Sequence, residues 1–320
     1  MSGNYQNQKL NCNDSAYKTE DSSNFQSTNF STSESQSVSN SIPSFNPYCI
    51  SFSREFIYPE TISKTWIPLL GMVDLYSFRA DFKDNILMLK NEKHIVGWKK
   101  SRGDGNCYYR SIIVKYLENM HKPYAPISKL ESFLSLIQSC ELKISKDENY
   151  KNAFKDMISY LEKTIENFIV NPIYVYLHFI DKTQDKSFDE MCVRVSRYLT
   201  ALEFIEMNNK NKLEGFLTDD SENIVKDILQ MGREGESLEL FLLPTALKCQ
   251  IVQYNFFRAN MQEVLFPSHE ENEFEKIYAI RREGHYDLLY TAQEQELDQY
   301  CFYTASYHFH NNNEKQKVLY

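Results

Sequence analysis

The chain has 320 residues and a formal net charge of −9, with 42% hydrophobic and 25% charged residues. This composition is typical of a globular protein with one large domain or two small ones. The negative charge argues against a general binder of the nucleic-acid backbone, which normally shows a basic face. No apolar run is long enough to span a bilayer and residues 1–9 contain no apolar signal, so we expect neither membrane association nor secretion.

The seven cysteines are scattered along the chain, whereas disulfide-stabilised secreted domains carry denser and paired cysteines. We therefore expect a reducing compartment, the cytoplasm, with the nucleus as the alternative. Cys140, Cys192 and Cys249 lie in apolar segments, where a free thiol packs like a small hydrophobic side chain. No Cys-x-x-Cys pair occurs, and His308 and His310 have no other ligands beside them, so no metal or organic cofactor is expected.

Residues 1–45 are predicted to form a disordered arm. They are rich in Ser, Asn, Gln and Thr, and they contain too few apolar residues to offset the entropy lost on ordering. A solvated tail is the favoured interpretation, and a partner-binding arm anchored by Phe25 and Phe30 is the alternative. Residues 46–290 have the composition of a folded domain, and residues 291–320 are predicted to form a polar C-terminal tail.

The folded part is predicted to be α+β, with a helical body followed by a small C-terminal sheet. Apolar residues at helical spacing indicate helices over residues 107–120, 127–140, 154–169, 191–207 and 238–247. Short segments rich in β-branched and aromatic residues indicate strands over residues 249–257, 275–281 and 286–290. Because the connections between these strands are short, we predict that they are antiparallel neighbours.

Cys107 follows a dense run of turn residues, 101–106, and begins the first predicted helix. The positive end of a helix dipole favours thiolate over thiol, and unpaired N–H groups at a helix start can bind a developing oxyanion. Gly103 and Gly105 allow the tight loop that such a site needs. The pattern therefore predicts a nucleophile beside its oxyanion hole, while an ordinary helix start, capped by Asn106 and carrying an incidental cysteine, stays open.

A thiolate needs a base, and His285 is the best placed of the seven histidines. His121 lies in a polar segment, and His178 lies in an apolar one. On a strand, His285 and Asp287 point to the same face because side chains alternate, so the carboxylate can accept the imidazole N–H and select its tautomer. A solvent-facing His/Asp pair on an edge strand is the plainer interpretation of the same residues.

Two short segments resemble one known family. Residues 104–110 match the Asp-Gly-Asn-Cys-x-x-Arg motif of the ovarian-tumour-domain cysteine proteases, and residues 284–290 resemble the closing strand of their otubain branch. Cys107 and His285 are 178 positions apart, a spacing similar to that of the otubains. The resemblance covers about residues 46–290 and implies a papain-like α+β fold with a small, mostly antiparallel C-terminal sheet.

The resemblance also implies an activity and its residues. Proteins of this family are deubiquitinases that cleave the isopeptide bond between the ubiquitin C-terminal glycine and a lysine, without a cofactor. Carried over by position, Cys107 is the nucleophile, His285 the general base and acid, and Asp287 the residue that orients His285. The backbone around Asp104 and Cys107 would supply the oxyanion hole. The partners implied are ubiquitin, polyubiquitin chains and a ubiquitin-conjugating enzyme.

Two alternatives to this activity remain from the sequence. One is a catalytically silent regulator with the same fold that binds ubiquitin or a conjugating enzyme. The other is a cysteine peptidase that acts on some other protein tail. The acidic segment 269–273 could attract the arginines of a ubiquitin tail, but a solvated hairpin loop explains its charges equally well.

Overall fold

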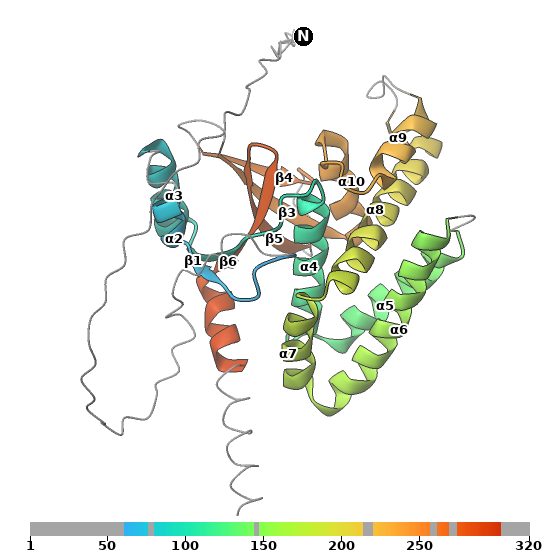
Figure 1. Cartoon of the computed structure of the whole chain (residues 1–320), viewed down its shortest axis with the longest axis horizontal. Coiled ribbons are helices and arrows are strands. Elements are labelled where there is room, and N and C mark those ends of the chain that lie inside the picture. Colours follow the sequence, from blue (N-terminus) through green and yellow to red (C-terminus); the bar gives the residue numbers. More distant parts are fainter. Residues whose placement is uncertain are drawn as a thin grey trace, which may run out of the picture. The chain divides into compact units, whose positions relative to one another are not determined.

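The computed structural model describes residues 61–75, 80–143, 147–213, 220–256, 261–268 and 274–301. The predicted arm 1–45, the acidic segment 269–273 and the pair His308 and His310 lie outside these residues. The described helices, labelled in Figure 1, are α2 Gly71–Leu75, α3 Ala80–Glu92, α4 Cys107–His121, α5 Ile127–Glu141, α6 Glu148–Val170, α7 Pro172–Lys182, α8 Lys186–Asn209, α9 Ser221–Leu229 and α10 Ser237–Leu247. The strands are β1 Ile67–Pro68, β2 Ile95–Lys99, β3 Cys249–Asn255, β4 Gln262–Phe266, β5 Glu275–Arg282 and β6 His285–Thr291.

Among the described residues, the six strands form one mixed sheet in the order β1-β2-β6-β5-β3-β4. The α+β class is therefore confirmed, and β5 and β6 are antiparallel as predicted. The prediction was wrong for β3 and β5, which pair in parallel. The reason is β4, a strand that we did not predict. Strand β4 pairs antiparallel with one edge of β3, so it runs in the opposite direction. The chain then reverses again and forms β5 on the other edge of β3, which makes β5 parallel to β3.

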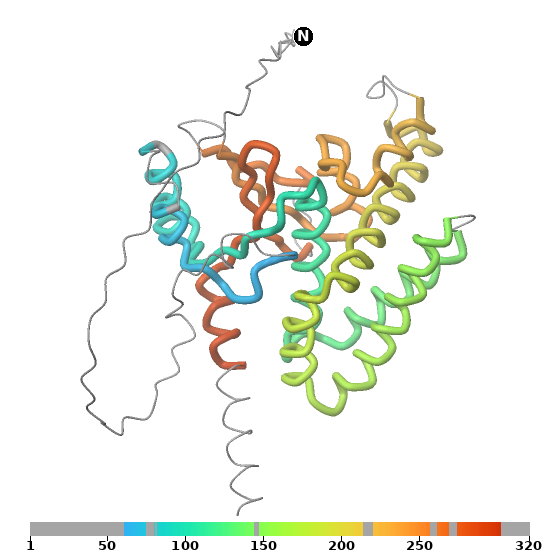
Figure 2. The backbone as a smooth tube through the Cα atoms, viewed as in Figure 1, coloured from blue at the N-terminus to red at the C-terminus, as the bar shows by residue number. Residues whose placement is uncertain are grey.

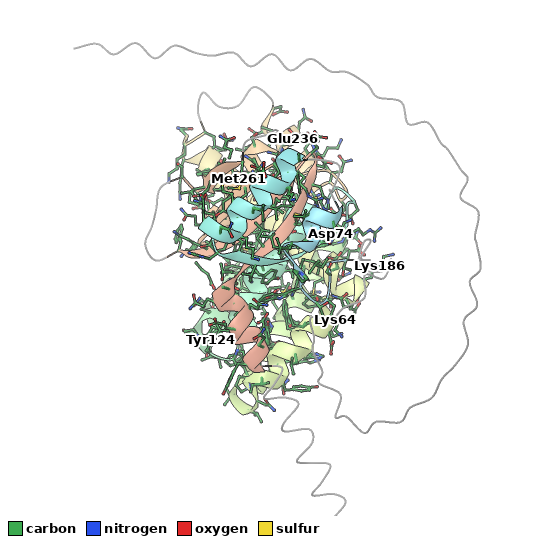
Figure 3. The ribbon with its side chains drawn as sticks, turned by 90° about the vertical axis from the view of Figure 1, so that its left-hand side faces the viewer. Lys64, Asp74, Tyr124, Lys186, Glu236 and Met261 are labelled. Carbon is green, nitrogen blue, oxygen red and sulfur yellow. The ribbon has the colours of Figure 1, made fainter. Side chains whose placement is uncertain are left out.

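The sheet separates two apolar clusters, because successive side chains of a strand point to opposite faces. On β6, Leu288 and Tyr290 pack with α4 and the helices beyond it, whereas Leu289 packs with α3. Figure 3 shows α3 lying across the sheet in front. Cys140, Cys192 and Cys249 are buried, free and part of the α4-side cluster, as predicted from their apolar surroundings.

Helix α4 is the centre of the larger cluster and is buried along nearly its whole length. Its last residue, His121, was wrongly placed in a polar segment. The ring is fully buried and stacks on Phe179 at 4.4 Å between ring centres. Its Nδ1 donates to the Leu117 carbonyl at 2.7 Å, and its Nε2 accepts from the Tyr160 hydroxyl at 2.8 Å. None of the described helices combines the length and the apolar character that a membrane span requires.

The polar tail begins with a helix over residues 292–301, which we did not predict. Glu294 of this helix accepts from two buried lysines: Lys115 of α4, with its Nζ at 2.6 Å, and Lys122, the C-cap of α4, with its Nζ at 3.1 Å. Lys115 also lies 3.4 Å from Glu118 and 3.9 Å from the ring centre of Tyr290. Figure 3 shows the helix beside Tyr124, which follows the C-terminal end of α4. Residues 291–301 of the predicted tail are thus part of the folded domain.

Candidate active site

Cys107 is the first residue of α4, and its side chain is almost completely buried, at 2% exposure. The chain enters the helix beside the turn between β5 and β6, as the backbone trace in Figure 2 shows. There the Cys107 Sγ lies 3.9 Å from the carbonyl oxygen of Gly284. The structure therefore brings the predicted nucleophile to the strand that carries the predicted base.

His285 and Asp287 point to the same face of β6, as their spacing predicted. His285 Nε2 and Asp287 Oδ1 are 2.8 Å apart, and the Cys107 side chain lies close enough to the same ring to raise its pKa. Because Asp287 occupies Nε2, the nitrogen left for Cys107 is Nδ1. Burial alone would lower the pKa of His285, but hydrogen bonds and charge from Asp287 and Cys107 raise it to about 9. The imidazolium form is therefore favoured at neutral pH.

Asp287 is fully buried, so it is not the solvent-facing carboxylate of the plainer interpretation. Its Oδ1 also accepts from the backbone N–H of Ser101 at 2.8 Å, and its Oδ2 accepts from Arg282. Burial would raise the pKa of Asp287, but the charge of Arg282 and the contacts with His285 and Ser101 hold it below its usual value. Asp287 is therefore an ionised, fixed acceptor for His285.

Asp104 shapes the loop that precedes Cys107. Its Oδ1 accepts from the Asn106 N–H at 3.0 Å, and Arg110 donates to both carboxylate oxygens at 2.9 and 2.7 Å. Arg110 is itself buried and paired with Asp189 of α8 at 2.7 Å. Burial would raise the pKa of Asp104, but Arg110 holds it below its usual value. The contribution of Asp104 to the site is thus the backbone shape around Cys107.

This geometry narrows the choice of oxyanion donor. The Asn106 N–H is occupied by Asp104, whereas the Cys107 N–H lies in the first turn of α4, where helical acceptors are lacking. Asn106 makes no side-chain cap to the helix, contrary to the alternative in which it is simply an N-cap. Of these two N–H groups, that of Cys107 is the better placed to donate to a bound carbonyl.

Sequence reasoning missed a second loop, residues 230–235, that supports the cysteine loop. Asn106 Oδ1 accepts from the Gly232 N–H at 2.9 Å and from Arg197 Nη2, also at 2.9 Å. The buried Arg197 further donates to the carbonyls of Ile228 and Arg233 at 2.8 and 2.5 Å. One arginine of α8 thus holds both loops together.

The two loops meet backbone to backbone. Gly105 has φ of +74°, and a Cβ there would lie 1.8 Å from the Gly232 carbonyl oxygen, so only glycine fits. A Cβ on Gly284 would meet the Glu234 carboxylate at 3.0 Å. The glycines at 232 and 235 were the available sequence signal for this loop, but nothing local relates them to Cys107.

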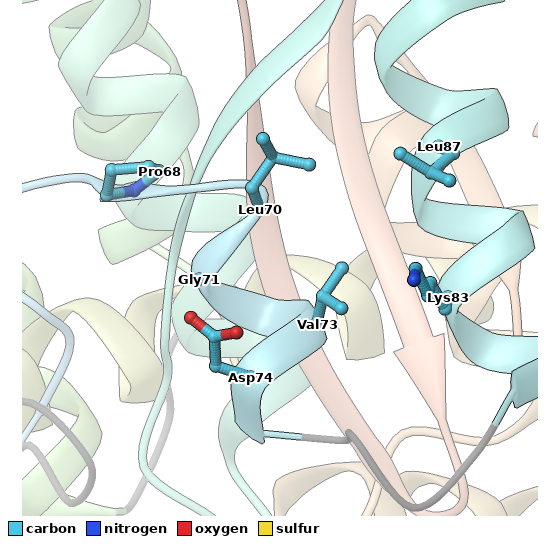
Figure 4. A pocket seen from close by; sticks show the side chains of 7 residues that line it. All are labelled: Pro68, Leu70, Gly71, Val73, Asp74, Lys83 and Leu87. Carbon is cyan, nitrogen blue, oxygen red and sulfur yellow. The ribbon is translucent and has the colours of Figure 1, made fainter.

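A separate pocket of about 350 Å³ lies between β1, α2 and α3. Figure 4 shows its lining side chains, which include Leu70, Val73, Asp74 and Leu87, and none of them belongs to the site around Cys107. Over the ranges that the structure describes, no three His, Cys, Asp or Glu side chains gather in a way that could hold a metal ion.

Comparison with known proteins identifies the family. The family described as Peptidase C65 Otubain matches residues 59–291, most of the chain. The chain belongs to the otubain family. This otubain is 24% identical over 236 residues to "Ubiquitin thioesterase OTUB2" of Mus musculus, a match that covers 69% of this chain and 94% of the relative. It is 21% identical over 251 residues to "OVARIAN TUMOR DOMAIN-containing deubiquitinating enzyme 1" of Arabidopsis thaliana, covering 70% and 81%.

Solved structures show the same fold. "The structure of a ceOTUB1 ubiquitin aldehyde UBC13~Ub complex" matches with a TM-score of 0.61 and 20% identity, over 74% of this chain and 95% of that one. A related complex, "The structure of h/ceOTUB1-ubiquitin aldehyde-UBCH5B~Ub", also matches with a TM-score of 0.61 and 20% identity. The helix over residues 292–301 and its Glu294 lie beyond the part of this otubain that the family match covers.

Proposed function

We propose that the protein is a deubiquitinating cysteine protease that hydrolyses the isopeptide bond between ubiquitin and a lysine, polyubiquitin chains included. The observation that carries the proposal is the position of His285, which is hydrogen-bonded to Asp287 and follows Gly284, whose carbonyl oxygen lies 3.9 Å from the Sγ of Cys107 at the start of α4. Membership of the otubain family and relatives named as ubiquitin thioesterases support it.

The reaction follows from these positions. The Cys107 thiolate attacks the carbonyl carbon of the ubiquitin C-terminal glycine, and the Cys107 N–H donates to the resulting oxyanion. His285, as imidazolium, gives its proton to the lysine amine as the isopeptide bond breaks, which leaves a thioester on Cys107. The neutral His285 then removes a proton from water and becomes imidazolium again, while the hydroxide attacks the thioester carbonyl. Collapse of this tetrahedral intermediate breaks the C–S bond, releases the ubiquitin carboxyl group and restores the Cys107 thiolate.

The proposal includes partners and boundaries. The similar solved structures are complexes of OTUB1 with ubiquitin aldehyde and with UBC13 or UBCH5B carrying ubiquitin, which supports ubiquitin and a conjugating enzyme as partners of this chain. We assign the activity to residues 46–290, and we place the protein in the cytoplasm or nucleus, where such conjugates occur.

A catalytically silent regulator is the second candidate, and one observation favours it. Cys107 is only 2% exposed: the carbonyl oxygen of Gly284 in the β5–β6 turn lies 3.9 Å from its Sγ, and Gly232 of the loop 230–235 packs against the nearby Gly105. In this alternative the loops keep the thiol covered when ubiquitin binds. In the proposed enzyme, ubiquitin binding moves them apart.

Incubation with ubiquitin that carries a C-terminal electrophile separates the candidates. The proposed enzyme forms a covalent adduct of 1:1 stoichiometry that Cys107→Ala abolishes, while Cys140→Ala, which alters another buried free thiol, leaves it intact. A silent regulator binds the probe without reacting with it. A peptidase for other tails neither binds ubiquitin nor reacts. Absence of an adduct in the wild-type protein would overturn the proposed activity.

A further inference from the structure

The Asp287 carboxylate contacts two cationic side chains rather than one. Oδ1 faces His285 Nε2 and the Ser101 N–H, both at 2.8 Å, and Oδ2 accepts from Arg282. The backbone donor holds Oδ1 in place independently of either side chain. The carboxylate therefore binds two side chains: His285, the base of the proposed reaction, and Arg282, which neither gains nor loses a proton in that reaction.

Arg282 is placed for this contact by the hairpin that carries the base. It is the last residue of β5, and its Cα partner across the hairpin is His285, the first residue of β6. Its side chain is 12% exposed, and its guanidinium lies 6.0 Å from the ring centre of Trp98. A charge so little exposed to water acts strongly on its neighbours, and a guanidinium stays protonated across the working pH range.

We propose that Arg282 is a positioning residue that limits, through Asp287, how firmly His285 holds its proton. The inference rests on the proposed function, since it assigns Arg282 a part in the Cys107–His285 chemistry. In that chemistry His285 must carry a proton to the leaving amine and then accept one from water. A buried carboxylate with no other counter-charge would favour the imidazolium so strongly that the first of these transfers becomes slow.

The other charged groups around His285 do not duplicate this role. Cys107 approaches the ring from α4, Lys100 follows β2 and senses the charge of Asp287, and Glu234 reaches over Gly284 from the loop 230–235. Among the described side chains, Arg282 and His285 are the two that hydrogen-bond to the Asp287 carboxylate. Its effect should therefore be separable from theirs by single substitutions.

The test is Arg282→Gln, measured in the full chain. Because the Ser101 N–H keeps Asp287 in place, removal of the guanidinium leaves the carboxylate balanced by His285 alone. We expect the alkaline limb of kcat/KM for a fluorogenic ubiquitin substrate to move up by about one pH unit. At neutral pH kcat should fall roughly tenfold while KM is unchanged, because proton release and not ubiquitin binding is affected. Arg282→Lys, which keeps the charge, should restore the limb to near its wild-type position.

Two controls isolate the path through Asp287. Arg281→Gln removes the same charge one residue away, where the guanidinium lies 5.5 Å from the Tyr286 ring centre on the other face of β5, and it should shift the limb far less. In an Asp287→Asn background, Arg282→Gln should produce no further shift. A limb that moves down, an equal shift in Arg281→Gln, or the same shift without Asp287 would each overturn the proposal.

Titration of the His285 ring by NMR provides a readout without ubiquitin. The pKa measured in this way should be higher in Arg282→Gln than in the wild-type protein, whether or not ubiquitin is hydrolysed. An unchanged ring titration would overturn the role of Arg282 even in an active enzyme. A shifted titration in a protein that does not react with ubiquitin would overturn the proposed function and retain the coupling of Arg282 to His285.

Discussion

Replacement of Glu294 by Gln would remove the carboxylate that holds the C-terminal helix against α4. In the wild-type protein this carboxylate accepts from Lys115 at 2.6 Å, from Lys122 at 3.1 Å and from the Thr291 N–H at 3.0 Å. The lysine side chains are 1% and 7% exposed, and the Glu294 side chain is 16% exposed. Glutamine keeps the shape and one acceptor, so the substitution changes little besides the charge.

The expected loss of stability follows from this burial. Breaking a buried ion pair by removal of one partner costs about 3–5 kcal/mol, and we take the lower end because Gln still accepts a hydrogen bond and Glu118 still faces Lys115. Glu294→Gln should therefore lower the free energy of unfolding by about 3 kcal/mol. For a domain of this size that corresponds to roughly 6–12 °C in Tm.

Urea unfolding followed by circular dichroism measures the change, with Glu296→Gln as the matched control. Glu296 is an exposed glutamate of the same helix, and its substitution should cost less than about 0.5 kcal/mol. The charges of Lys115 and Lys122 hold the pKa of Glu294 well below its usual value of 4.5, although burial opposes them. The difference between wild type and Glu294→Gln should thus be complete above pH 4.5 and shrink as the pH falls below it. Equal midpoints for the two variants at pH 7 would refute the reasoning.

Three further predictions concern the site. Gly105→Ala should reduce kcat by roughly 10²-fold, because the new Cβ displaces the Gly232 loop. Gly103→Ala should reduce kcat less, because its Cβ only touches the His285 ring at 3.5 Å. Steady-state kinetics of both variants test this difference. Asp287→Asn should lower kcat by roughly 10–10³-fold with ubiquitin affinity retained, as measured by kinetics and calorimetry, and an unaltered kcat would remove Asp287 from the mechanism. Since the pKa of His285 is raised to about 9, kcat/KM of the wild-type enzyme should decline only above about pH 9. Asp287→Asn should move this alkaline decline to lower pH. A decline of the wild-type kcat/KM near pH 6.5 would contradict the interactions of His285 with Asp287 and Cys107.

The predictions that the structure confirmed depend on residues close together in the sequence. A thiol after a run of turn residues indicates a helix start, and alternation along a strand places His285 and Asp287 on one face. The α+β class and β5–β6 pairing follow from the same local patterns. The approach of Cys107 to the strand of His285, 178 positions away, was expected only from the resemblance of the two segments to one family.

The features that were missed depend on contacts between distant segments. Arg197 holds Asn106 from 91 positions away, and Glu294 meets Lys122 from 172 positions away. The parallel pairing of β3 with β5 depends on which edge of β3 is taken by β4. Propensity and periodicity contain no information about such partners, because a buried arginine or lysine looks like a surface residue until its acceptor is known.

The place of β6 in the sheet determines when the site can exist during synthesis. A nascent chain that has emerged only as far as Arg282 contains Cys107 but neither His285 nor Asp287. It also lacks β6, the strand that lies between β2 and β5 in the sheet. At ordinary rates of translation, roughly 10–40 s separate the appearance of the thiol from that of its base. During that interval the ribosome-bound chain has an unassisted cysteine and a gap in its sheet. The strand that closes the gap also delivers the base, so the proposed activity cannot begin before β6 has been made.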